Sequence, residues 1–142
     1  MPATDLEQRI IEAIVAVLAV DAGVQAITGR LTGNILPWQD SEALTYPVLL
    51  YQVPTIDPYG GEGDTRLAEV QLTAVADGEG AGATTRALLE RVELGLTQPL
   101  LEAQGLDAAV IRSRRRGATP EGSTGSRGTT RADIILTVYV TK

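Results

Sequence analysis

RLAEVQLTAVA, residues 66 to 76, is the stretch that decides the fold of this chain. Apolar side chains occupy every second position, and Glu69, Gln71 and Thr73 stand between them. An alternation of period two predicts a β-strand with one buried face and one face in contact with water. Such a strand needs an apolar layer against only one side of its sheet. The stretch therefore predicts a sheet that is covered on one face.

Two amphipathic segments are predicted to form the covering layer. The first covers about residues 5–20, where a capping-box spacing of Thr4 and Glu7 precedes apolar side chains at helical intervals. The second is TTRALLERVELGL, residues 84–96, which ends before Pro99. The apolar stripes consist of Leu6, Ile10, Ile14, Val17 and Leu18 in the first segment, and of Leu88, Leu89, Val92 and Leu96 in the second. Each stripe is wide enough to bury one side of a helix.

Three further segments are predicted to be strands. YPVLLYQVP places an apolar run at 48–53 between two prolines, and residues 106–114 and 130–141 are rich in β-branched and aliphatic side chains. The predicted order is helix, strand, strand, helix, strand, strand. We therefore expect an α+β fold, a mainly antiparallel sheet with two helices on one face, in a single domain over residues 1–142. Residues 21–46 and 57–64 are expected to be connections.

The composition removes most catalytic chemistry. The chain contains no histidine and no cysteine, and its one lysine is Lys142 at the end of the sequence. The commonest general bases and nucleophiles are thus missing, and we expect no enzyme, no cofactor and no catalytic residue. A carboxylate enzyme is the remaining catalytic alternative, with candidates Asp57, Glu62, Asp64, Asp77 and Glu79.

Two glycine-rich loops are candidate ligand sites. DPYGGEGD, residues 57–64, lacks the alternating ligands of a calcium loop, so a solvated hairpin loop is expected, and weak metal binding at 57–64 is left open. DGEGAG, residues 77–82, has neither the dinucleotide nor the P-loop pattern. No run of apolar residues reaches the length that crosses a bilayer, and no membrane partner is expected.

A basic cluster interrupts this acidic chain of net charge −6. Arg112, Arg114, Arg115 and Arg116 are followed by a Gly, Ser and Thr-rich segment that contains Arg127, and residues 112–128 are predicted to be a flexible arm. If the strand continues, Arg112, Arg114 and Arg116 share one face. The arm is interpreted as a solvated loop, as a segment that orders against an acidic surface of another subunit, or as a nucleic-acid contact. The last is disfavoured because no aromatic residues are interleaved with the arginines.

In order, spacing and character, the segments resemble the tail terminator (tail completion) proteins of long-tailed phages and gene-transfer agents, the family that includes the lambda tail terminator. The likeness runs from about Leu6 to Val140. It depends most on Tyr46 and Pro47 leading into 48–51, and on the alternating strand that ends at Ala76 just before a helix. No single diagnostic motif carries it.

The resemblance implies a virion protein that is made in the host cytoplasm and forms a sixfold ring at the head-proximal end of the tail tube. There it stops polymerisation and offers a surface for head-tail joining. The implied partners are other copies of the chain, the tail-tube protein and the head-tail connector, with DNA only in transit through the lumen. Another connector protein, a tail-tube subunit and a nucleic-acid binder remain alternatives. We expect the subunit or tube interface to include the five arginines of the arm, Arg112, Arg114, Arg115, Arg116 and Arg127, although the arm matches no family feature.

Overall fold

The computed structural model describes residues 5–38, 45–57, 63, 65–121 and 129–141, and of residues 117–121 it describes the backbone alone. The elements in this part of the chain are α1 (Asp5–Ala19), α2 (Ala22–Thr28), β1 (Ile35–Pro37), β2 (Val48–Tyr51), β3 (Thr55–Asp57), β4 (Thr65–Asp77), α3 (Ala81–Gly95), α4 (Gln98–Ala103), β5 (Ala108–Glu121) and β6 (Thr129–Thr141).

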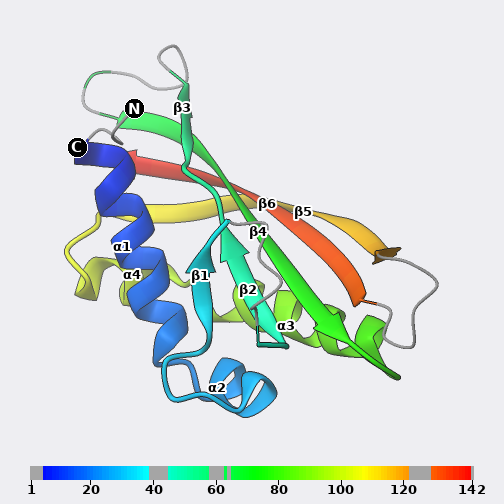
Figure 1. The fold of residues 1–142 in the computed structure, drawn as a ribbon. Coiled ribbons are helices and arrows are strands. Elements are labelled where there is room, and N and C mark those ends of the chain that lie inside the picture. Colours follow the sequence, from blue (N-terminus) through cyan, green and yellow to red (C-terminus); the bar gives the residue numbers. More distant parts are fainter. Residues whose placement is uncertain (1–4, 39–44, 58–62, 64, 122–128, 142) are drawn as a thin grey trace.

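The strands form one twisted sheet, and the helices lie on one side of it (Figure 1). The strand order is β1-β2-β4-β6-β5, and β3 pairs with β4 beside β2. Only the pairing of β1 with β2 is parallel, and the other pairings are antiparallel. The expected α+β class with a mainly antiparallel, one-sided sheet is confirmed.

The core lies between the sheet and the helices. Strand β4 is its centre, because Ala68, Val70, Leu72 and Ala74 are all at most 1% exposed and point to the helix side. Strand β6 pairs with β4 along its whole length and adds a second row of buried side chains, Ala132, Ile134, Leu136, Val138 and Val140. The two predicted stripes of α1 and α3 close the core from the other side.

Four short elements were missed by the sequence prediction. Helix α2 lies within the predicted connection 21–46, where Asp21 caps its N-terminus and Gly29 ends it in the left-handed conformation. Strand β1 lies in the same connection, and β3 ends at Asp57, the first residue of the predicted loop 57–64. In α4, Pro99 occupies the first turn, where a missing amide hydrogen costs nothing. Seven residues or fewer are too short to show a periodicity.

The arm was also predicted wrongly in part. Strand β5 does not end near residue 114 but continues to Glu121, so the first ten residues of the predicted flexible segment belong to a strand that pairs with β6, with an irregularity between Arg116 and Thr119. Residues 122–128 of the arm lie outside the described residues. The long partner strand explains the difference, since β6 offers a backbone ladder to any sequence opposite it.

The face of the sheet away from the helices, here called the outer face, has a small apolar cluster near β2. Val48, Leu50 and Val75 are buried there, and Leu36 and Tyr46 pack against them. Among the described elements no helix covers this face. No single described helix is long and apolar enough to cross a membrane. Helices α1 and α2 together have the required length and apolar composition, but they are bent by 74° relative to each other.

Candidate functional site

A β-bulge at Ile111 decides which way the arginines of β5 point. Ala108 and Val110 pair with Val140 and Val138 and face the helices. Ile111 has no partner on β6, and the pairing resumes with Arg112 opposite Thr137. One unpaired residue shifts the alternation by one position, so the side chains after it change faces.

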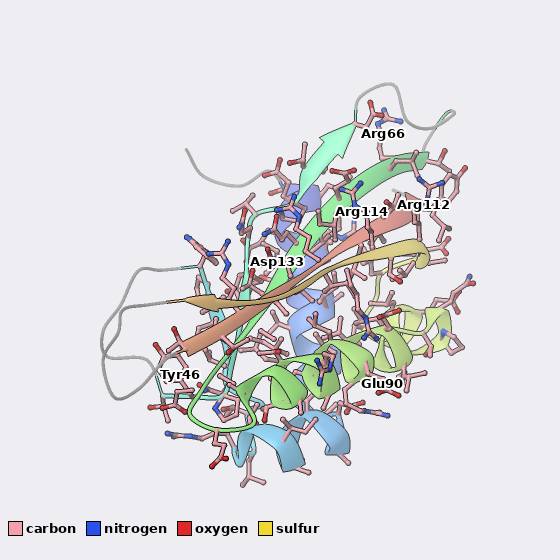
Figure 2. The ribbon with its side chains drawn as sticks, turned by 90° about the vertical axis from the view of Figure 1, so that its right-hand side faces the viewer. Tyr46, Arg66, Glu90, Arg112, Arg114 and Asp133 are labelled. Atoms are coloured by element: carbon pink, nitrogen blue, oxygen red, sulfur yellow. The ribbon has the colours of Figure 1, made fainter. Side chains whose placement is uncertain are left out.

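Three arginines therefore form a line on the outer face. Arg112, Arg114 and Arg116 stand opposite Thr137, Ile135 and Asp133 of β6, and all three arginines are exposed. Figure 2 shows Arg112 and Arg114 on the side of β5 away from α3, which carries Glu90. Alternate residues of a strand are about 6.6 to 6.8 Å apart. These three side chains, called the arginine row below, confirm the expectation that they share one face.

Arg115 points the other way and is engaged within the molecule. Its Nε donates to Glu93 Oε1 of α3, and the Ser113 hydroxyl donates to Glu93 Oε2 at 3.0 Å. One carboxylate thus ties two residues of β5 to the helix layer. Of the five arginines expected at an interface, the structure places three together, directs Arg115 to α3, and does not describe Arg127.

Asp133 lies at the end of the arginine row and is 5% exposed. The Thr73 hydroxyl donates to its Oδ1 at 2.7 Å. Two guanidinium groups flank the carboxylate, Arg131 with Nε 3.7 Å from Oδ1 and Arg116 with Nη1 3.9 Å from Oδ2. The buried charge is therefore surrounded by one hydrogen-bond donor and two cations, which offsets the cost of its desolvation.

Aromatic side chains lie near both ends of the row. Tyr139 is 40% exposed and is the next outer-face residue of β6 after Thr137. At the other end, the guanidinium carbon of Arg131 lies 5.1 Å from the ring centre of Trp38, which is 37% exposed and lines a shallow hollow with Val53. Neither aromatic residue was predicted from the sequence to lie at a functional site. The position of Tyr139 between Val138 and Val140 in an alternating strand could have predicted that its side chain faces away from the core. The contact of Trp38 with Arg131 could not have been predicted from a local pattern, because the two residues are 93 positions apart.

The described members of the candidate carboxylate set, Asp57, Asp77 and Glu79, do not form one group. Asp57 pairs with Leu67 at one end of β4, and Asp77 is the last residue at the other end, about 33 Å away along the strand. Glu79 is exposed in the following turn. Glu62 and Asp64 lie outside the described residues, as does most of the loop 57–64. Within the described ranges, no three metal-ligating side chains form a group.

Comparisons with known proteins give one informative result. No family model matches the chain, and no curated protein matches its sequence. Among solved structures, a chain of the "Virion of native gene transfer agent (GTA) particle" is similar, with a TM-score of 0.65 and 13% sequence identity. The match covers 99% of this chain and 100% of that chain. At this identity the similarity shows that the two chains share a fold from end to end.

Proposed function

We propose that this chain is a structural virion subunit, specifically a tail terminator that caps the head-proximal end of a tail tube as a ring. In that position it stops tube polymerisation and presents a surface for head-tail joining. The observation that carries the proposal is the end-to-end similarity of fold to a chain of a gene transfer agent virion. The resemblance of the sequence to tail terminators points to the same class of particle.

A closed ring needs two different surfaces on each subunit, because only a head-to-tail contact generates a cycle. The sheet supplies two unlike edges. At one edge is β1, of three residues, and at the other is β5, of 14 residues. Each has an unpaired side among the described strands. We place the ring contacts at these two edges.

The first test measures the mass of the purified protein by light scattering over a concentration series. The measurement is made with and without purified tail tubes from the same genome. We expect either a discrete ring or a monomer that becomes a stoichiometric cap at one end of the tube. Growth of the protein alone into long tubes would identify a tube subunit instead. A monomer that does not bind tubes would refute the terminator role.

A variant of the β5 edge makes the test specific. Ile111 is 59% exposed at the bulge, so Ile111→Asp is expected to leave the fold intact and to weaken ring or tube association at least about tenfold. Val20→Asp is the matched control, because Val20 is an exposed apolar side chain, 72% exposed, that follows α1 in the helix layer. Equal association of the two variants would exclude β5 as a contact edge.

A further inference from the structure

The arginine row is a basic strip on an acidic molecule. The chain has a net charge of −6, and the row contributes +3, so the rest of the chain carries −6 − 3 = −9. The row lies on the outer face, which also carries the exposed carboxylates of Asp57 and Glu69, and the exposed carboxylates of Asp5, Glu12, Glu90 and Glu102 belong to the helices. A polyanion is therefore attracted most strongly where three guanidinium groups stand in line, along the arginine row.

The described part of the chain does not neutralise the arginine row with short ion pairs. In the described part of the chain, neither Arg112 nor Arg114 has an ion pair, and Arg116 reaches Asp133 only at 3.9 Å. By contrast, Arg91 donates to Asp21 at 2.9 Å and Arg115 is in close contact with Glu93. The guanidinium groups of Arg112 and Arg114 are therefore available to a partner outside the subunit, and that of Arg116 makes only a long contact with Asp133.

The surroundings of the row fit a nucleic acid better than a protein surface. Protein interfaces are enriched in arginine, but they surround it with apolar and aromatic side chains at their centre, whereas the row faces Asp133, Ile135 and Thr137, of which only Ile135 is apolar. Regularly spaced guanidinium groups suit a chain of regularly spaced phosphates, to which each can donate two hydrogen bonds. Proteins that bind single strands combine such a basic track with exposed aromatic rings on an open sheet, and Tyr139 is placed to stack on a base.

We propose that the arginine row binds the phosphodiester backbone of DNA without reading its sequence, and that Tyr139 stacks on bases when the DNA is single-stranded. This inference goes beyond the proposed ring and does not depend on it. Its competitor is the contact with an acidic surface of another subunit, which the same arginines were expected to make from the sequence.

The test is fluorescence anisotropy with a labelled 30-nucleotide single strand and a 30-base-pair duplex of the same sequence, at 50 and 200 mM salt. The variant R112Q/R114Q/R116Q is compared with R9Q/R30Q/R86Q, which removes three exposed arginines outside the outer face. Both variants have a net charge of −6 − 3 = −9, so a difference between them reports the position of the charges.

We expect the row variant to bind DNA at least about tenfold more weakly than the wild type, and the control to change less than about threefold. Three neutralised phosphates predict that the fourfold rise in salt weakens wild-type binding about 20- to 40-fold. Tyr139→Ala is expected to weaken single-strand binding about fivefold or more and duplex binding less. Urea unfolding of each variant verifies that it is folded.

Three outcomes would overturn the inference. They are the absence of DNA binding by the wild type at 50 mM salt, an equal loss in the two triple variants, and binding of labelled polyglutamate as tight as that of the single strand. The last result would favour an acidic protein surface. A ring-forming protein that does not bind DNA would refute this inference alone, while DNA binding by a monomer that does not bind tubes would refute the terminator role alone.

Discussion

At the scale of single residues, the buried carboxylate of Asp133 connects the core of the sheet with the arginine row. Its short hydrogen bond from Thr73 crosses from β6 to β4, where the two residues are direct partners. Thr73 is itself fully buried, so this hydroxyl has no water to replace its acceptor. The pair therefore fixes the carboxylate beside Arg116 and Arg131.

Thr73→Val keeps the shape of the side chain and removes the donor to Asp133. We expect a loss of about 1 to 3 kcal/mol in the free energy of unfolding, because a buried carboxylate loses its closest hydrogen bond. Urea denaturation measures it. Thr137→Val, at a partly exposed position of the outer face, is the control and should change stability by less than about 0.5 kcal/mol. Equal effects would show that the hydrogen bond contributes little.

The second ion pair of note joins α2 to α3. The Asp21 carboxylate accepts from Arg91 Nη2 at 2.9 Å and Nε at 3.2 Å, and from the Val24 amide at 3.0 Å. The hydrogen bond from Arg91 is the main reason that the pKa of Asp21 lies below its ordinary value. Gly23 leaves room for this arrangement, because a Cβ there would lie 2.3 Å from Arg91 Nε.

Arg91→Gln should raise the pKa of Asp21 toward its ordinary value of 3.8, as followed by NMR of the carboxyl carbon. A carboxyl group whose pKa is lowered by folding stabilises the fold above its unfolded pKa, and this contribution is lost as the pH falls through the folded pKa. The stability difference between wild type and variant should therefore be largest at neutral pH and disappear as the pH falls through the lowered folded pKa of Asp21. An unchanged pKa in the variant would contradict the assigned cause.

At the scale of elements, the bulge at Ile111 divides β5 into two segments. The segment before it contributes side chains to the core, and the segment after it carries the exposed arginine row. Before it, Val110 packs against the core cluster; after it, the exposed row begins. Bulges and charged side chains also make an edge strand a poor template for unspecific pairing. The edge can thus be exposed in the subunit and still be used in a specific contact.

Substitutions at three successive positions test the bulge. Val110→Asp places a charge against the core and should cost roughly 2 kcal/mol or more. Ile111→Asp places the same charge at the unpaired, exposed position and should change stability by less than about 0.5 kcal/mol. Thermal and urea unfolding compare them. A regular strand would also bury residue 110 and expose residue 111, so the third substitution, Arg112→Asp, decides. It should change stability by less than about 0.5 kcal/mol, whereas a strand without the bulge would turn this charge toward the core and give a cost like that at residue 110.

At the scale of the whole molecule, one core on one side of the sheet leaves the other side for external contacts. The helices carry exposed carboxylates, and the outer face carries the arginine row beyond the small cluster at Val48 and Leu50. The two unlike sheet edges lie at the ends of the strand order. A subunit built in this way has distinct surfaces for neighbours and for a polyanion, as the two proposals require.

The α+β class, the one-sided sheet and the two long helices could be predicted from the sequence because each depends on a local periodicity. The alternation of residues 66–76 already requires one buried face, whatever strand lies beside it. The short elements could not be predicted: β1 has three residues and exists because it pairs with β2, and α2 depends on a cap and on its contact with α3.

The direction of the arginines was decided only by the tertiary structure. The sequence alone determined that Arg112, Arg114 and Arg116 would share a face if the strand continued through them, since this follows from period two. Continuing the phase of Ala108 and Val110 would have turned the three toward the helices. The unpaired Ile111 reverses that phase, and its existence depends on the register with β6, a strand that is distant in sequence. A local pattern contains no information on the partner strand, and so the side on which the charge is displayed is a property of the folded sheet.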